Sequence, residues 1–128
     1  MAAATDPLRQ DAERRGRRAE TLALWLLRAK LYRLLARRYR TPAGEIDLIV
    51  KRGRTIAFVE VKHRPTADAA REALYARNRQ RIARAARIWL SHNPGAAGHD
   101  YRFDVVIAAS GALPRHIAGV FDSEGESW

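Results

Sequence analysis

The segment GEIDLIVKRGRTIAFVEVK, residues 44–62, decides how this chain is interpreted. It predicts two β-strands, Glu45–Lys51 and Thr55–His63, joined by a short loop at Arg52-Gly53. Glycine suits such a loop because it adopts positive φ angles without strain. Charged side chains nevertheless interrupt both strands, although strands buried on both faces are usually almost wholly apolar. The first question is therefore why a hairpin with the composition of a core carries acids and a lysine.

Alternation of side chains along a strand places these charges on one face of the hairpin. With the loop given above, Glu45 is expected opposite Glu60. Asp47 is then opposite Phe58 and is a diagonal neighbour of Glu60, about 7–8 Å away between Cα atoms. Lys62 shares this face. The other face is wholly apolar and is expected to be core: Ile46, Leu48, Val50, Ala57, Val59 and Val61.

The grouped charges favour a metal site over a structural ion pair. Carboxylates that lie close together repel one another, and partial burial makes them harder to ionise. Magnesium and manganese are usually bound by one or two carboxylates together with waters and phosphate oxygens. Asp47 and Glu60 are therefore candidate ligands in a phosphodiesterase site, where Lys62 would position water or offset phosphate charge. The alternative is a solvated strand edge, which Glu-x-Lys alone usually indicates, and Glu45 is best interpreted as an exposed strand end.

The remaining patterns predict the order helix, strand, strand, strand, helix, strand. A helix from Arg17 to Lys30 is indicated by an apolar stripe at helical spacing. A strand over Leu31–Arg40 precedes the hairpin, and a helix over Thr66–His92, broken near Tyr75, follows it. A last strand covers Tyr101–Ala109. This order predicts a mixed sheet with helices packed on it, an α/β sandwich.

The chain is expected to form one folded domain with two flanking segments. Residues 1–15 are interpreted as a flexible basic lead-in, residues 16–110 as the domain, and residues 111–128 as a C-terminal tail. Trp25 and Trp89 lie at helical core spacing and are expected to pack inside.

The charge balance favours a polyanionic partner. The chain has 24 Lys and Arg residues against 14 Asp and Glu residues, a net charge of +10. Nucleic acid is the first candidate. An anionic membrane surface is the second, but it would require a basic amphipathic helix with a bulky apolar face. A merely arginine-rich composition is the third. The candidate phosphate contacts, which would not read bases, are Arg17, Arg18, Arg77, Arg81 and Arg84.

Location is predicted from what the sequence lacks. There is no cysteine, and therefore no disulfide frame, thiol nucleophile or cysteine-based zinc site. The first 18 residues contain no apolar segment typical of a signal peptide. The longest apolar run, Leu22–Leu27, is far shorter than the roughly 20 residues of a membrane span. A cytoplasmic protein that does not enter a membrane is expected.

An acid that ends one strand of a hairpin, followed by Glu-x-Lys on the next strand, resembles the PD-(D/E)xK nuclease superfamily. More closely, the chain looks like the YraN family, bacterial proteins assigned to the same restriction-endonuclease-like α/β/α fold. The stretches that carry this resemblance are GRRAETLALWLL, ARRYRTPAGEIDLIVKRGRTIAFVEVKHR and YRFDVVIAA, in that order. The resemblance implies an αβββαβ core with a mixed sheet, in which GEIDLI and FVEVK form the site.

The resemblance also implies roles for individual residues. Asp47 matches the metal-binding aspartate of the superfamily, Glu60 the acid of the (D/E)xK element, and Lys62 its lysine. The carbonyl of Val61 matches a backbone group that often completes metal coordination. Glu20 matches a catalytic acid on the first helix, although by its position alone it is better explained as an exposed first-turn glutamate.

The function that the resemblance implies is that of a Mg²⁺- or Mn²⁺-dependent endonuclease acting on structured or branched DNA. Holliday-junction resolvases belong to the same superfamily and make two cuts, which is compatible with a homodimer. Two alternatives stay open: a non-catalytic DNA- or RNA-binding module of the same fold, and a basic regulatory subunit in DNA repair or recombination.

Overall fold

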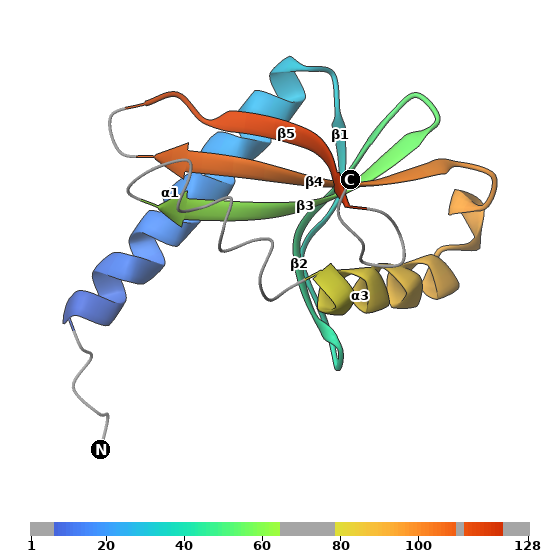
Figure 1. The fold of residues 1–128 in the computed structure, drawn as a ribbon, viewed down its shortest axis with the longest axis horizontal. Helices are drawn as coiled ribbons and strands as arrows, with labels where there is room; N and C mark the ends of the chain where they lie inside the picture. Colours follow the sequence, from blue (N-terminus) through green and yellow to red (C-terminus); the bar gives the residue numbers. More distant parts are fainter. Residues whose placement is uncertain (1–6, 65–78, 110–111, 122–128) are drawn as a thin grey trace.

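The computed structural model describes residues 7–64, 79–109 and 112–121 (Figure 1). In chain order the elements are α1 (Pro7–Ala29), β1 (Arg33–Thr41), β2 (Gly44–Arg52), β3 (Thr55–Arg64), α3 (Arg79–His92), the 3₁₀ turn η1 (Pro94–Ala96), β4 (Asp100–Ala109) and β5 (Arg115–Phe121). The first part of the predicted second helix, including Tyr75 and Arg77, lies outside the described residues. In the described part of the chain, no helix is long and apolar enough to span a membrane.

The strands form one mixed sheet in the order β1-β2-β3-β4-β5. Neighbours are antiparallel except β3 and β4, which are parallel. A parallel pair needs a crossover connection, and here α3 belongs to it. The helices lie on opposite sides of the sheet (Figure 1). The predicted α/β fold with an αβββαβ core is confirmed, and it is consistent with a restriction-endonuclease-like sandwich.

Helices cover both faces of the hairpin strands, and two hydrophobic clusters result. The cluster beneath α1 contains Ala23, Leu24, Leu27, Leu48, Val50, Ala57, Val59 and Val106. The cluster beneath α3 contains Ile46, Ile49, Ile56, Phe58, Ile82, Trp89 and Phe103. The face predicted to carry the charges is therefore itself buried over Ile49, Ile56 and Phe58. The charges are confined to one end of it.

The placement of Ile46 on the same face as Leu48 was wrong. Ile46 packs beneath α3, whereas Leu48 packs beneath α1, so strict alternation fails between them. The β1–β2 register matches Arg37 with Leu48 and Tyr39 with Ile46, which leaves Arg38 level with Asp47. Arg38 has a φ of 51°, a left-handed conformation that interrupts the regular pleat at this level.

The hairpin register differs from the predicted one by two residues. Arg52 pairs with Thr55, so the loop is Gly53-Arg54, and Ile49 lies opposite Phe58. Gly53 has a φ of 60°, and a positive φ at the first loop residue alone is typical of a type II′ turn. A register shift by two residues does not by itself move a side chain to the other face of a strand. The predicted grouping of charges is therefore retained.

The ends of the chain also differ from the expectation. The first helix begins at Pro7 rather than Arg17, so residues 7–15 of the predicted lead-in are helical. Proline is common at a helix start because its missing N–H has no partner to lose there. Trp25 is 65% exposed, so its predicted burial was wrong, whereas Trp89 is buried as predicted. Residues 115–121, part of the predicted tail, form β5.

A buried polar cluster links β5 to β4 through hydrogen bonds to Asp104. The Asp104 side chain is fully buried and accepts hydrogen bonds from Arg102 Nε at 2.8 Å and from His116 Nε2 at 2.7 Å. The N–H of Gly119 in β5 donates to the same carboxylate at 3.1 Å. Burial by itself would raise the pKa of Asp104, but the hydrogen bonds from His116 and Arg102 hold that pKa below its ordinary value. The carboxylate therefore stays charged inside the fold.

Candidate functional site

The site lies where β2 and β3 separate. The two strands pair from Arg52 opposite Thr55 as far as Leu48 opposite Val59. Beyond that point β2 continues paired with β1, and β3 continues paired with β4. Figure 1 shows the β1–β2 hairpin turning away from β3. Asp47 follows the last pair on β2 and Glu60 follows it on β3, so these two acids stand at the fork.

The Asp47 side chain forms a hydrogen bond to the β3 backbone just beyond the point where pairing of β2 with β3 ends. Its Oδ2 accepts a hydrogen bond from the Val61 N–H at 2.7 Å. The Asp47 and Glu60 carboxyl groups are close enough for each to affect the pKa of the other. Glu60 is only 9% exposed, and its Oε1 lies 3.1 Å from Lys62 Nζ. The structure thus brings Asp47, Glu60 and Lys62 together around the Val61 peptide group.

The two carboxyl groups at the fork resist ionisation. Burial, with repulsion from Glu60 as the second cause, raises the pKa of Asp47 from 3.8 to about 8. The hydrogen bond from Val61 and the charge of Lys62 only partly oppose this rise. Burial also raises the pKa of Glu60, against the effect of Lys62. The ammonium group of Lys62 is therefore not enough to make both acids stable as anions.

Glu20 stands near the fork but has other partners. Its Oε1 lies 2.9 Å from Arg38 Nε and 3.7 Å from Arg37 Nε. Its negative charge contributes to the raised pKa of Asp47, behind burial and Glu60. Sequence reasoning missed Arg38 as the partner of Glu20, since Arg38 is one of four arginines in β1. A role for Glu20 in catalysis stays a prediction.

The donor groups at the fork fit a magnesium or manganese ion that is shared with a substrate. Among residues 7–64, 79–109 and 112–121, no three His, Cys, Asp or Glu side chains are grouped to hold a metal ion by themselves. Magnesium does not need such a cage, because it commonly takes one or two carboxylates and completes its shell with waters and phosphate oxygens. Asp47 and Glu60 supply two carboxylates for such a shell, and the Val61 carbonyl stays a predicted third ligand. A divalent cation would also offset the burial that raises the pKa of both acids, together with the repulsion that Glu60 exerts on Asp47.

One predicted phosphate contact adjoins the acids. A cavity of about 190 Å³ is lined by Gly44, Glu45, Glu60, Arg81 and Ile82. Arg81 belongs to the first turn of α3 and packs closely on the tip of the β1–β2 hairpin. A Cβ added to Gly44 would lie 3.4 Å from Arg81 Cβ, and Gly44 has a φ of +156°, so glycine suits this contact.

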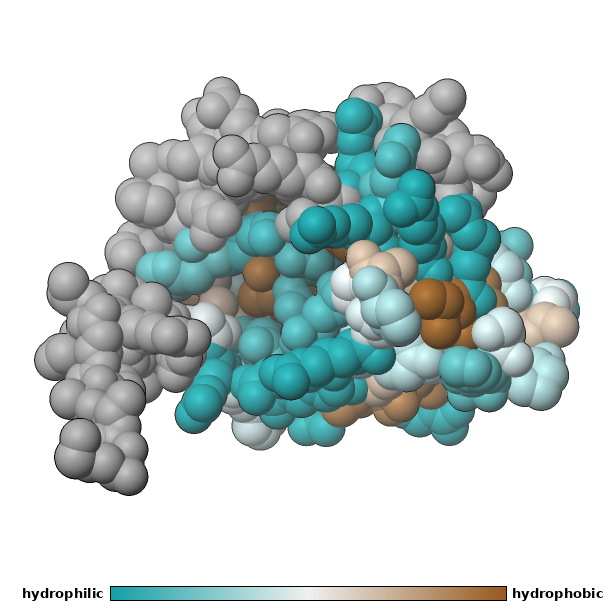
Figure 2. Space-filling model, turned by 90° about the horizontal axis from the view of Figure 1, so that it is seen from below, coloured by the Kyte–Doolittle hydropathy of each residue, from teal (hydrophilic) through white to brown (hydrophobic). Residues whose placement is uncertain are grey.

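The other predicted contacts are spread over the surface. Arg84 is exposed on α3, whereas Arg17 and Arg18 border a shallow cavity on α1 with Thr21 and Leu22. Arg77 is outside the described residues. Figure 2 shows the molecule from the side of α3 and the β1–β2 hairpin, where most of the coloured surface is hydrophilic.

The fold and the fork define an α/β protein of the restriction-endonuclease-like kind, with two acids and a lysine where the central strands part. The model of the uncharacterised protein family UPF0102 matches residues 19–108, and the chain belongs to this family, which is the YraN family. The predicted resemblance is thereby confirmed. The matched residues include Asp47, Glu60 and Lys62, and they end before β5.

Relatives match the chain over most of its length. A UPF0102 protein of Methylorubrum extorquens (strain PA1) is 57% identical over 111 residues, covering 87% of both chains. One from Parvibaculum lavamentivorans is 56% identical over 107 residues, covering 84% of this chain and 80% of the relative. One from Rhodopseudomonas palustris (strain BisB5) is 48% identical over 117 residues, covering 91% and 89%. These names specify a family and no activity.

Proposed function

We propose that the protein is a Mg²⁺- or Mn²⁺-dependent nuclease that hydrolyses phosphodiester bonds in structured or branched DNA. The observation that carries the proposal is the meeting of Asp47, Glu60 and Lys62 at the fork between β2 and β3. Two partly buried acids with raised pKa values are costly in a fold, and a role in holding a cation explains why they are tolerated. A cytoplasmic location and a homodimer remain parts of this proposal.

Each residue at the fork has a distinct role in this proposal. Asp47 and Glu60, with the carbonyl of Val61, would hold the metal ion, which supplies charge to polarise a phosphate and acidify water. The Val61 N–H fixes the Asp47 carboxylate in place. Lys62, held beside Glu60, orients the attacking water or offsets charge on the phosphate. Hydrolysis adds water across one P–O bond and leaves a phosphomonoester and a hydroxyl group.

The arginines of α3 are suited to hold the DNA backbone next to the acids. Arg81 borders the cavity that contains Glu60, and Arg84 is exposed on the same helix. Guanidinium groups contact phosphates without distinguishing bases, which fits recognition of DNA shape rather than sequence. The net charge of +10 supports the same partner.

A second candidate function is a non-catalytic DNA- or RNA-binding module. The observation in its favour is that Glu20 Oε1 lies 2.9 Å from Arg38 Nε. A glutamate held in this ion pair does not join Asp47 and Glu60 as a further acid at the fork. A module of this kind would bind nucleic acid in a salt-sensitive manner and would leave it uncut.

Lys62→Ala is expected to reduce metal-dependent cutting of branched DNA by about 100- to 1,000-fold, the scale of losing one preorganised charge at a transition state. The measurement uses branched and linear DNA with Mg²⁺, Mn²⁺ or EDTA. Arg28→Ala, which removes one exposed positive charge at the end of α1, is the control and should cut normally. Salt-sensitive DNA binding without any cutting by the wild-type protein would favour the binding module instead.

A further inference from the structure

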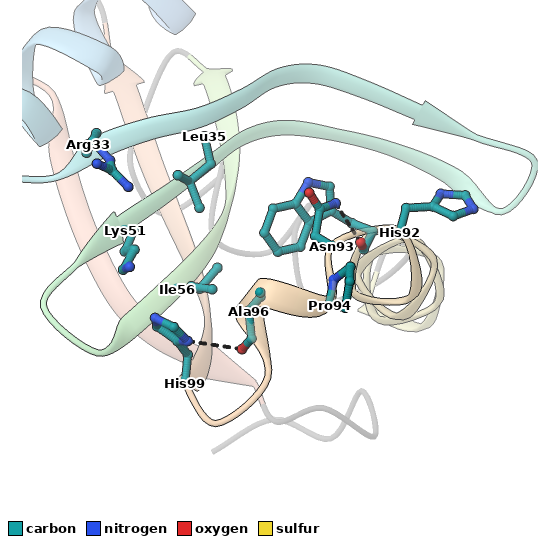
Figure 3. A pocket seen from close by; sticks show the side chains of 11 residues that line it. Arg33, Leu35, Lys51, Ile56, His92, Asn93, Pro94, Ala96 and His99 are labelled. Atoms are coloured by element: carbon teal, nitrogen blue, oxygen red, sulfur yellow. Dashed lines mark hydrogen bonds between the residues drawn. The ribbon is translucent and has the colours of Figure 1, made fainter.

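A second cavity, of about 390 Å³, lies beside the C-terminal end of α3 (Figure 3). The cavity lined by Glu60 lies beside the first turn of that helix. Arg81 borders the cavity beside Glu60, and Trp89 borders this one, about 12 Å further along the helix axis at 1.5 Å per residue. Its size falls within the range of about 300–1,000 Å³ that is usual for small-molecule sites. It is therefore separate from the candidate metal site.

The charges around this cavity are of one sign. The titratable residues that line it in the described part of the chain are Arg33, Lys51, His92 and His99. Arg33 and Lys51 are direct partners in the β1–β2 register, so two positive side chains face each other across the strands. Like charges in directly opposite positions destabilise a sheet. An anion bound between Arg33 and Lys51 would remove this repulsion.

The floor of the cavity is apolar and closely packed. Leu35, Ile56 and Trp89 contribute to it from β1, β3 and α3. Trp89 is 6% exposed, and its ring meets Phe58 edge to face with ring centroids 5.8 Å apart. A floor fixed in this way suits a flat, apolar body, since little side-chain freedom is lost when a ligand binds.

Two hydrogen-bond acceptors border the cavity from the segment between α3 and β4 (Figure 3). Asn93 donates its Nδ2–H to the Trp89 carbonyl at 2.8 Å, which leaves Oδ1 as the acceptor of this side chain. His99 Nδ1 donates to the Ala96 carbonyl at 3.1 Å, so Nε2 is the acceptor of the neutral ring. Acceptors of this kind recognise the amino group of a nucleobase.

We propose that this cavity binds a nucleoside monophosphate, either as a free nucleotide or as an unpaired nucleotide of a nucleic acid strand. Arg33 and Lys51 hold the phosphate, Ile56 and Trp89 support the base, and Asn93 and His99 contact its polar edge. The contacts include none of the residues at the fork. Binding is therefore independent of a metal ion and of the nuclease function proposed above.

The test is a titration in EDTA, followed through the backbone N–H signals of Gly95 and Ala96, which line the cavity. The probes are dAMP, deoxyadenosine and inorganic phosphate. We expect dAMP to shift both signals and to bind at least about tenfold more tightly than either fragment. Lys51→Ala and Arg33→Ala should each weaken dAMP binding about tenfold, and Arg28→Ala should change it less than about twofold.

A second arm compares a duplex that carries one unpaired adenosine with the fully paired duplex. A preference for the unpaired nucleotide that disappears in Lys51→Ala assigns the cavity to nucleic acid. Binding of dAMP without such a preference assigns it to a free nucleotide. The proposal is overturned if neither dAMP nor the unpaired duplex shifts Gly95 and Ala96, if phosphate binds as tightly as dAMP, or if Lys51→Ala has no effect. Because EDTA is present throughout, failure of the nuclease proposal does not alter these outcomes.

Discussion

Asp47→Asn is expected to abolish metal-dependent cutting and, at the same time, to make the protein more stable at pH 8. Cutting should fall at least about 100-fold, because a ligand charge at the reacting phosphate is lost. Above pH 8, where Asp47 is ionised in the absence of metal, the variant should bind DNA more tightly, since it lacks a negative charge that would repel phosphate. Asparagine can still accept a hydrogen bond from the Val61 N–H through Oδ1, so the contact that holds this side chain is retained.

The stability effect follows from the pKa of Asp47. In the folded protein this pKa is raised from 3.8 to about 8, mainly by burial and then by Glu60. Between these pH values the unfolded chain has released a proton that the folded protein still holds, so wild-type stability falls as pH rises. The asparagine variant lacks this loss and should be more stable by on the order of 2 kcal/mol at pH 8, with no such advantage below pH 4.

Thermal unfolding of both proteins in EDTA, from pH 4 to pH 8, measures this difference. The gap in Tm should open with rising pH, in the absence of metal and DNA. A difference in Tm that does not change with pH, or a variant that cuts DNA normally, would contradict the role assigned to Asp47.

Asp104→Ala is expected to destabilise the fold more than any other change considered, by about 3–5 kcal/mol, because it leaves the Arg102 guanidinium and the buried His116 imidazole without their shared partner. The carboxylate is fully buried and binds groups from Arg102, His116 and Gly119. The corresponding fall in Tm is roughly 10–15 °C. Asp104→Asn, which keeps an acceptor but no charge, should lose less. Asp100→Ala, an exposed position at the start of the same strand, is the control.

The contribution of Asp104 also has a defined pH dependence. In the folded protein the pKa of Asp104 is below its ordinary value. The carboxylate therefore stabilises the fold fully at any pH above the pKa that Asp104 has in the unfolded chain. This stabilisation is lost as pH falls through the folded pKa. The wild type should therefore approach the Asp104→Ala variant in stability only in strong acid. A difference below about 1 kcal/mol at pH 7 would contradict the role assigned to this cluster.

The grouping of Asp47, Glu60 and Lys62 was predictable from residue spacing, although the alternation assumed for it fails beside Asp47, at Ile46. Asp47, Glu60 and Lys62 were placed on one face from residue spacing, and that placement tolerated a register error because the error was an even number of residues. The exchange of faces at Ile46 was not predictable, since it occurs beside the irregular conformation of Arg38 in a neighbouring strand, which residue spacing does not report.

The features that sequence reasoning missed join residues far apart in the chain. Glu20 meets Arg38 from a different element, and His116 meets Asp104 from a strand whose sequence, RHIAGVF, has no clear alternation. Partners of this kind are fixed by tertiary packing, and no spacing in the sequence reports them. The exposure of Trp25 could not be predicted for the same reason. The packing of α1 on the sheet decides which side of the apolar stripe of α1 is covered.

The central claim is that the acids at the fork bind a divalent cation, and calorimetric titration with Mn²⁺ tests it most directly. Because ligands must lose their protons, wild-type protein should bind Mn²⁺ more tightly at pH 8 than at pH 6, with proton release, and a DNA ligand should strengthen binding. Asp47→Asn and Glu60→Gln should each remove this binding, and Arg28→Ala should retain it. No Mn²⁺ uptake by the wild type at pH 8 with DNA present, or equal uptake by Asp47→Asn, would contradict the account.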